Sequence, residues 1–330
     1  MPEPSAEPGE EIIRSLATDE RREMVPPDAA SLQIAAVEAG PEIAGAAAGR
    51  KRLGIGAWLA AIWLILVIGS AIAAPILPIP DPKRDSTLPE LSSDGSLSVI
   101  AAAPSLDHPF GLDASGLDVF SRTIWGGRAS LIIGFVSIGL GFLVGGFLGM
   151  LSGYFKGKVG GFIGSLLDIL LAFPQLVLAI FVVEVLGHTV WFVTFALAIV
   201  ATPVLARITR ASSLSWSERE FVVAARAQGA KHGRVMLREV LPNTLPAMFA
   251  IAILSVAVVI VAEAGLAIVG AGVNPSVITW GNMISAGQAD LKASPHIVLA
   301  PSLVIFLTVL SLNYLGDVIR ARTDVRESAL

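Results

Sequence analysis

Residues 129–151 read ASLIIGFVSIGLGFLVGGFLGML, and none of their side chains is ionisable. At a helical rise of about 1.5 Å per residue, a run of this length can cross the hydrocarbon core of a bilayer, which is about 30 Å thick. A strand of a membrane barrel would instead alternate apolar and polar residues over segments of about ten residues. The run therefore predicts a transmembrane α-helix.

A ladder of small residues runs along the same stretch. Glycine recurs at every fourth position from 141 to 153, which places these residues on one face of the helix. The ladder consists of Gly141, Gly145, Gly149 and Gly153. A neighbouring helix can approach such a face closely, and that helix could belong to this chain or to another subunit.

The apolar character extends over most of the chain. Of the 330 residues, 54% are hydrophobic and 15% charged, and the mean hydropathy is +0.74, whereas soluble globular domains have about 25% charged residues. Further apolar runs of spanning length lie at 53–74, 159–186, 189–206, 245–269 and 297–315. The sequence thus predicts an all-α membrane protein with six transmembrane helices, of which Pro174, Pro203 and Pro301 could kink three.

Lysine and arginine are distributed unevenly between the two sides of the membrane. The formal net charge of −4 conceals this pattern, because the charges are segregated along the chain. If the N-terminus is cytoplasmic, eighteen of the 23 Lys and Arg residues fall on the cytoplasmic side. The bias predicts cytoplasmic termini, outer loops at 75–128 and 270–296, and a cytoplasmic loop at 207–243.

Four segments follow from this topology. Residues 1–49 are rich in Glu, Ala and Pro and predict an acidic, mostly disordered cytoplasmic tail, in which 10–25 could form a short amphipathic helix. Residues 50–106 hold the first transmembrane helix and an extracytoplasmic loop. This helix should remain as an anchor, because about 50 polar residues precede it and it is longer than the apolar part of a signal peptide. Residues 107–318 form a core of five transmembrane helices, and 319–330 form a cytoplasmic tail.

Few residues offer catalytic or metal-binding chemistry. The chain has no cysteine, and its four histidines lie far apart in the sequence, so we expect no catalytic site, metal or cofactor in this chain. His108, Asp113 and Asp118 could be combined into an oxygen-rich metal site. The alternative, which the glycine-rich context favours, is that both aspartates cap turns and helix starts.

The loop at 207–243 contains a short regular helix. Ser217 and Glu220 have the spacing of a capping box, and Gly229 lies where a left-handed residue would end the helix. One face of this helix is expected to hold Phe221, Ala224, Ala225 and Gln228. Its alanines leave a shallow surface against which another protein can lie. A second, basic helical stretch at 231–240 follows, and Leu241 and Pro242 then lead into the next apolar run.

These residues resemble a known family, the ABC importer permeases of the dipeptide and oligopeptide type (DppC/OppC-type, binding-protein-dependent). The loop is similar to the EAA loop of these permeases, although Val223 replaces the glutamate of the motif. The matching segments are EFVVAARAQGA at 220–230, LPN at 241–243, HPFG at 108–111, AFP at 172–174, AEA at 262–264, WGNM at 280–283 and NYLGD at 313–317, with Asp113, Gly116, Asp118, Val119, Ser121, Arg122 and Asp168. Leu112 and Leu117 depart from the usual Thr and Arg, and the acidic tail is not shared.

The resemblance implies a type I ABC importer permease fold and a place in the bacterial cytoplasmic membrane. It implies four kinds of partner: a homologous B-type permease, two ATP-binding subunits or one fused ATPase, an extracytoplasmic binding protein, and the peptide substrate. The helix from Glu220 would be a coupling helix, and the coupling residues would be Glu220, Phe221, Ala224, Ala225, Gln228, Gly229, Leu241 and Pro242. ATP and Mg would be bound by the partners, because this chain has no phosphate-binding loop of the Walker type.

Charged side chains within the apolar runs are the remaining candidates. Asp168, Glu184 and Glu263 lie where a charge is costly, so each faces a transport pathway or a structural partner. Trp280 and Asn282 in the outer loop could gate a cavity, contact the binding protein, or form a packed turn with the Trp at the headgroup level.

Two other functions remain open. Permeases for nickel, glutathione or another small solute share the same motifs. An ATP-independent secondary transporter would need inverted repeats and ion sites within the membrane, and no duplicated half is evident.

Overall fold

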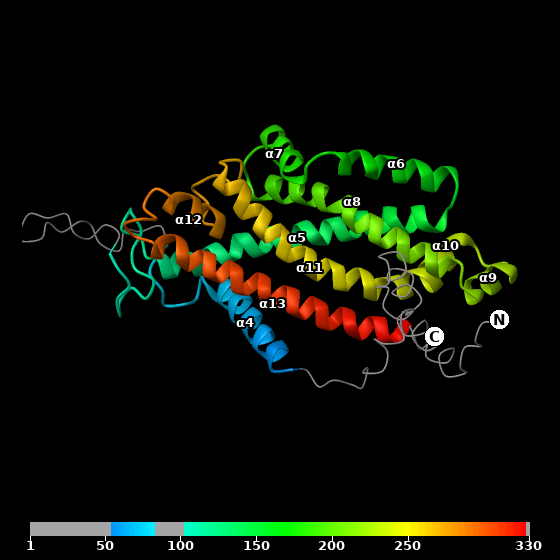
Figure 1. Cartoon of the computed structure of the whole chain (residues 1–330), viewed down its shortest axis with the longest axis horizontal. Helices are drawn as coiled ribbons and strands as arrows, with labels where there is room; N and C mark the ends of the chain where they lie inside the picture. Colours follow the sequence, from blue (N-terminus) through cyan, green and yellow to red (C-terminus); the bar gives the residue numbers. More distant parts are fainter. Residues whose placement is uncertain (1–53, 83–101, 328–330) are drawn as a thin grey trace, which may run out of the picture. The chain divides into compact units, whose positions relative to one another are not determined.

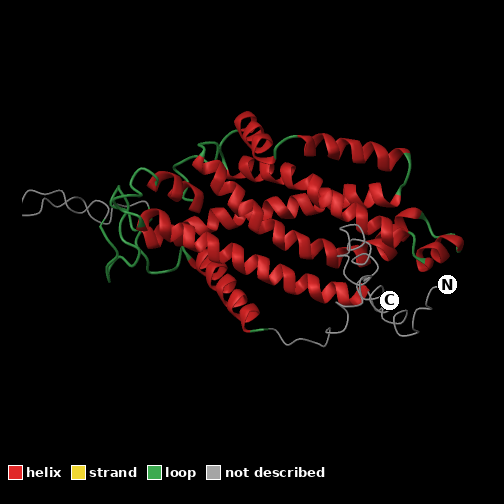
Figure 2. Ribbon diagram, in the orientation of Figure 1, coloured by secondary structure: helices red, strands yellow, loops and turns green. Residues whose placement is uncertain are grey.

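The computed structural model describes residues 54–82 and 102–327, with side chains described as far as residue 321. All regular elements in these ranges are helices (Figure 2). The predicted tail at 1–49, its possible helix at 10–25 and part of the first outer loop lie outside the described residues.

Within the described residues, five helices are long and apolar enough to cross a membrane. They are α4 (Ile55–Ala73), α5 (Val119–Tyr154), α8 (Val190–Ser217), α11 (Leu241–Ile268) and α13 (His296–Glu327) (Figure 1). Each matches one predicted apolar run, so these five predictions are confirmed. The helices continue through Pro203 in α8 and Pro301 in α13.

The third predicted run is not one continuous helix. It consists of α6 (Lys158–Ala172) and α7 (Gln175–Leu186), which meet at 91°. Phe173 has an extended backbone, and Pro174 caps the start of α7. A proline ring lacks an N–H group and disfavours helical geometry in the residue before it, so the helix ends at this point. The bent pair supplies a sixth span only if both helices count as one.

The glycine ladder packs α5 against α8. A Cβ atom on Gly145 would lie 2.5 Å from the carbonyl oxygen of Thr202, and one on Gly153 would lie 2.6 Å from that of Arg210. Real Cβ atoms essentially never approach other atoms so closely, so only glycine fits at these positions. The predicted close approach is confirmed, and the neighbouring helix belongs to this chain.

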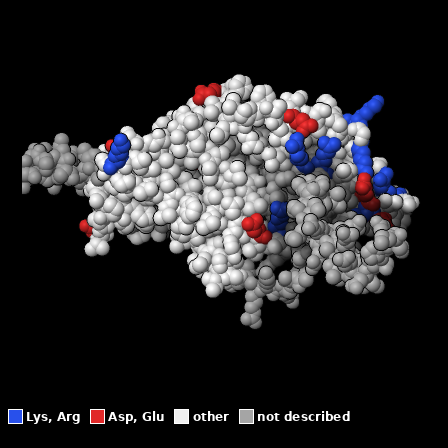
Figure 3. Space-filling model, viewed as in Figure 1, with Lys and Arg blue, Asp and Glu red and all other residues white. Residues whose placement is uncertain are grey.

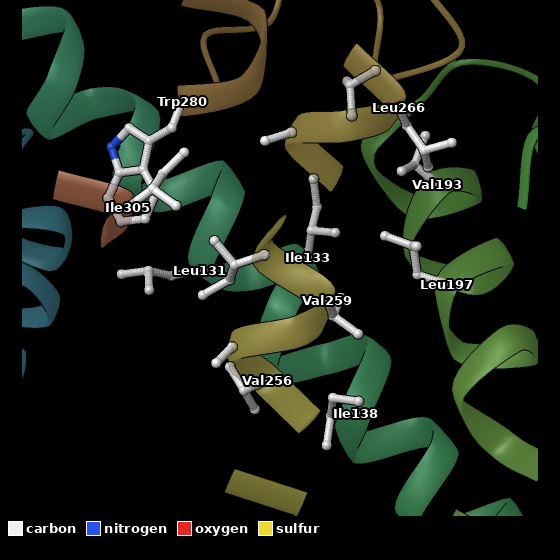
Figure 4. Close-up of a cluster of buried hydrophobic side chains, with 14 of the residues drawn as sticks. Leu131, Ile133, Ile138, Val193, Leu197, Val256, Val259, Leu266, Trp280 and Ile305 are labelled. Carbon is white, nitrogen blue, oxygen red and sulfur yellow. The ribbon is translucent and has the colours of Figure 1, made fainter. Parts of the chain in front are cut away.

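A buried hydrophobic cluster fills the space between α5, α8 and α11 (Figure 4). Leu131 and Ile133 of α5 lie beside residues of α8 and α11 such as Val193 and Val259. Trp280 closes the cluster at one end; it belongs to α12 (Trp280–Gly287). This core joins helices that are distant in the sequence.

Short elements lie at opposite ends of the long helices (Figure 1). One end holds α9 (Glu220–Ala227) and α10 (His232–Val235), which continues through a π-helix, η1 (Met236–Val240), into α11. The other end holds α12.

Candidate docking helix and intramembrane charges

The start of α9 differs from the predicted capping box. Ser217 is the last residue of α8, and its hydroxyl group donates a hydrogen bond to the carbonyl oxygen of Leu214 at 2.8 Å. The N-cap of α9 is Arg219, whose side chain makes no capping bond. The predicted capping box is therefore wrong. The helix α8 extends beyond its apolar run, and Ser217 is part of α8 rather than the N-cap of α9.

The end of α9 is confirmed as predicted. Gly229 has a φ of 86°, in the left-handed region that favours glycine. The N–H of Ala230 donates to the carbonyl oxygen of Ala225 at 3.1 Å, and that of Gly229 donates to Arg226 at 3.0 Å. These two bonds form a Schellman motif, which satisfies carbonyl groups at the helix end.

The two sides of α9 have different surroundings. Val222 is fully buried and Ala225 is half-buried, whereas Phe221, Ala224 and Gln228 are exposed. The helix therefore presents a shallow, small-residue surface next to one aromatic ring. Val222 was not predicted as part of this site, although an apolar residue in a polar loop helix could have indicated the buried side.

Val222 anchors α9 to a group of residues that we call the loop cluster. Its buried members are Met150, Tyr154, Trp216, Val222, Val235, Met236 and Val240. They come from α5, α8, α9, α10 and η1. The hydroxyl group of Tyr154 also lies 2.9 Å from Nδ1 of His232. Because packed interiors transmit displacement rather than absorb it, a force on α9 reaches the ends of α5, α8 and α11 together.

Leu241 and Pro242 are the first two residues of α11. Proline is common in the first turn of an α-helix because its fixed φ suits the helical backbone. The basic stretch predicted at 231–240 is helical, as α10 and η1, and α11 begins four residues before the predicted start at 245. The chain thus passes from the loop into the span without an intervening coil.

Glu263 is fully buried within α11 and is connected to two other helices. Its Oε2 accepts a hydrogen bond from the hydroxyl group of Ser130 in α5 at 3.4 Å, and the hydroxyl oxygen of Ser130 accepts from the backbone N–H of Trp280 at 3.1 Å. Among the described residues, Oε1 has no hydrogen-bond partner. The carboxyl group lies inside the bundle and joins α5, α11 and α12.

The two outer-loop candidates hold the backbone in place. Trp280 is 1% exposed and donates from Nε1 to the carbonyl oxygen of Thr123 at 2.8 Å. The side-chain amide of Asn282 donates to the carbonyl oxygens of Val273, Asn274 and Val277 at 2.9–3.2 Å. The packed turn is therefore observed, and its Trp is buried inside the protein rather than exposed on the surface.

The two other carboxylates in the apolar runs are exposed in this chain. Oδ1 of Asp168 in α6 accepts from Nη2 of Arg207 in α8 at 2.7 Å. Glu184 lies 3.7 Å from Nε2 of His188, with 57% of its side chain exposed. Neither makes a hydrogen bond or ion pair with Glu263, so the structure does not combine the three carboxylates into a single site, although it connects Glu263 with Trp280 through Ser130.

The aspartates before α5 cap backbone groups, as the second of the two alternatives predicted. Asp118 accepts from the N–H of Ser121 at 2.6 Å at the start of α5, and its other oxygen contacts Nδ1 of His108. Asp113 accepts from the N–H groups of Ser115 and Leu117. Within the described ranges, no group of three or more acidic or histidine side chains could hold a metal ion.

We expect substitutions of Glu263 to separate its structural role from a pathway role. Glu263→Ala should lower the free energy of unfolding by about 2–4 kcal/mol, because it leaves a cavity and deprives Ser130 of its acceptor. Glu263→Gln keeps the shape and should stay close to the wild type in thermal unfolding and in transport. A Gln variant that folds normally but transports poorly would assign the carboxylate to the pathway instead.

Long apolar helices with a short exposed helix at one end agree with the fold of an ABC importer permease. The chain belongs to the family of binding-protein-dependent transport system inner membrane components, whose family model matches residues 145–327. It is a multi-pass protein of the bacterial inner membrane.

Individual relatives agree with this assignment. The chain is 35% identical over 269 residues to the dipeptide transport system permease protein DppC of Alkalihalophilus pseudofirmus, covering 81% of this chain and 85% of the relative. It is 36% identical over 221 residues to the glutathione transport system permease protein GsiD of Pectobacterium atrosepticum, covering 67% and 73%. An inward-facing structure of the MetNI methionine ABC transporter shares the fold, with a TM-score of 0.52, 19% identity, and coverage of 61% of this chain and 96% of that one.

Proposed function

We propose that this permease is one subunit of an ATP-driven importer of dipeptides or oligopeptides. In this proposal it pairs with a homologous B-type permease and receives substrate from an extracytoplasmic binding protein. Two ATP-binding subunits, or one fused ATPase, bind ATP and Mg, and the chain itself has no catalytic site. Closure of the ATPases moves the spans and alternates access to a central cavity.

The observation that carries this proposal is the exposed surface of α9 above the loop cluster. Phe221 is 41% exposed beside the small Ala224, whereas Val222 on the other side is fully buried. A partner can therefore lie close to the helix, and its motion passes through Val222 to three spans. Glu220, Gln228 and Gly229 border the same exposed surface.

Charge supports a cytoplasmic position for α9. Lys and Arg side chains gather at the end of the bundle that holds α9 and α10 (Figure 3). Cytoplasmic segments of membrane proteins carry an excess of such residues. The proposed topology therefore keeps both termini, the segments 1–49 and 319–330, and the loop 207–243 in the cytoplasm, with 75–128 and 270–296 outside.

The relatives favour peptides over the other solutes considered. One is named for dipeptide transport and another for glutathione, which is itself a short peptide. A substrate with a peptide bond and free charged ends suits both names. Glutathione remains the second candidate, and the two relatives reported above are named for neither nickel nor ATP-independent transport.

A single cysteine tests the docking role of α9, because the chain has none of its own. We expect Ala224→Cys to form a cross-link with a co-purified ATPase subunit when a short bifunctional thiol reagent is added. Ala224 is preferred to Ala225, which is half-buried against the loop cluster. The control is Ser276→Cys in the outer loop, where the side chain is also exposed and no ATPase cross-link is expected. Failure to capture an ATPase from any exposed position of α9 would refute the proposed coupling.

A further inference from the structure

Three charged side chains gather where α6 packs against α8. The side chains of Asp168 and Arg207 form an ion pair at 2.7 Å and are 64% and 65% exposed. Arg210 follows one turn later along α8 and is also exposed. Its guanidinium group lies over α6, since a Cβ atom on Gly164 would be 2.6 Å from Nη1. We call Asp168, Arg207 and Arg210 the charged triad.

The position of the triad is unfavourable for contact with lipid. Asp168 lies within the apolar run of α6, ten residues from the start of that helix and therefore about 15 Å along it. Ionisable side chains within apolar runs face protein or a water-filled cavity rather than acyl chains. The triad is exposed in the single chain, and Arg207 and Arg210 begin the segment assigned to the cytoplasm, so we take its surface to face a polar space at the cytoplasmic end of the spans.

The exposed surface of α6 supports this conclusion, since it is divided into two stripes. One stripe is apolar and consists of Phe162, Leu166 and Ile169, which are 74%, 48% and 59% exposed, followed by Phe173 just after the helix, which is 51% exposed. The other is small and polar and consists of Gly161, Ser165, Asp168 and Ala172, all exposed. Asp168 thus belongs to a stripe that leaves room beside the triad and offers a hydroxyl group.

The charges of the triad do not balance. Two guanidinium groups accompany one carboxylate, and Arg210 has no ion-pair partner within the described part of the chain. Asp168 uses Oδ1 for Arg207, which leaves Oδ2 as an acceptor. Arginine binds carboxylates through two parallel hydrogen bonds, and a carboxylate accepts readily from an ammonium group. The triad can therefore receive one anionic and one cationic group side by side.

We propose that the charged triad binds the two charged ends of a zwitterionic solute on its way through the permease. The solute carboxylate pairs with Arg210, and the solute ammonium group pairs with Asp168. Arg207 is a positioning residue, because it holds the carboxylate of Asp168. This inference rests on the proposed function, since a short peptide with free ends carries both groups.

The test compares two substrates in the complete transporter, reconstituted with its binding protein in proteoliposomes. The probes are alanyl-alanine and its C-terminal amide, which lacks the carboxylate. We expect Arg210→Gln to lower the ratio of their import rates about tenfold, which is the effect of losing a hydrogen-bonded charge pair. The preference of the binding protein is the same for every permease variant, so a change in this ratio belongs to the permease. A purely structural loss would lower both rates equally.

Two glycines of α6 supply a matched control that leaves every charge in place. Gly164→Ala adds a methyl group against the guanidinium of Arg210 and should lower the ratio in the same direction, by a smaller factor. Gly161→Ala adds the same methyl group where no atom lies within 4 Å and should leave the ratio unchanged. Arg210→Lys should recover part of the discrimination, because it restores the charge without the paired geometry.

Each contrary outcome has its own meaning. If the wild type imports alanyl-alanine and Arg210→Gln leaves the ratio unchanged, the inference about the triad fails and the proposed function stands. If the wild type imports neither probe nor any other short peptide, the proposed function fails and this inference fails with it. If Arg210→Gln slows both probes equally and only in vesicles with anionic phospholipid, the triad binds lipid phosphate, and the inference is overturned.

Discussion

Gly149→Leu should destabilise the permease by about 3 kcal/mol, the upper part of the range for overpacked interiors. A Cβ atom at this position would collide with the carbonyl oxygen of Ala206 and lie 2.7 Å from Cβ of Thr209. Backbone cannot move aside as a flexible side chain can, so α5 and α8 must separate along their contact. Thermal unfolding of the detergent-purified chain, followed by size-exclusion chromatography of the remaining folded fraction, measures the effect.

Gly139→Ala on the same helix is the control for this variant. No atom lies within 4 Å of a Cβ at position 139, and alanine favours a helix over glycine by about 0.5–1 kcal/mol. We therefore expect unchanged or slightly raised stability. If Gly149→Leu unfolded at the same temperature as Gly139→Ala, the two helices would not pack through the ladder as described.

Ala224→Arg should reduce ATP-driven transport at least tenfold while the amount of folded permease stays the same. Ala224 is exposed on α9, and arginine is a good helix former, so the variant chain should fold normally. On the surface proposed for docking, however, a long charged side chain would hold the partner away from the helix. The measurements are substrate-stimulated ATP hydrolysis and import by the reconstituted transporter, with folded permease quantified in parallel.

Ala224→Ser is the control for side-chain size, because it changes the residue at this position without adding a large side chain. Serine is nearly as small as alanine, so close approach is preserved and transport should remain near the wild type. Normal transport by the Arg variant would show that no partner lies against this surface, and the coupling role of α9 would have to be abandoned.

Hydropathy alone located the long helices, because apolar length is what a bilayer demands. Pro174 indicated a break in the third run, but hydropathy could not give the 91° angle between α6 and α7, which depends on the local geometry of Phe173 and Pro174. The spacing of the glycines predicted a close contact. The sequence could not show which helix makes that contact, because this depends on the tertiary structure. The structure shows that it is α8.

The proposed docking site was predictable in part. Gly229 indicated the end of α9 because a left-handed residue is a local requirement. The capping box predicted at Ser217 was wrong because a capping serine cannot be distinguished in sequence from a serine in the last turn of a helix. The pairing of Asp168 with Arg207 joins residues that are 39 positions apart, so no local pattern could reveal it.

The π-helical segment η1 has a consequence for the direction of α9. A π-turn accommodates one residue more than an α-turn, and the N–H of Leu241 bonds back to the carbonyl oxygen of Met236. With one residue fewer between 236 and 240, α10 and α11 would join as an ordinary α-helix. Everything before the junction would then be rotated by about 100° around the axis of α11, the angle that separates successive residues. The number of residues in η1 therefore determines the direction around the axis of α11 in which α9 points.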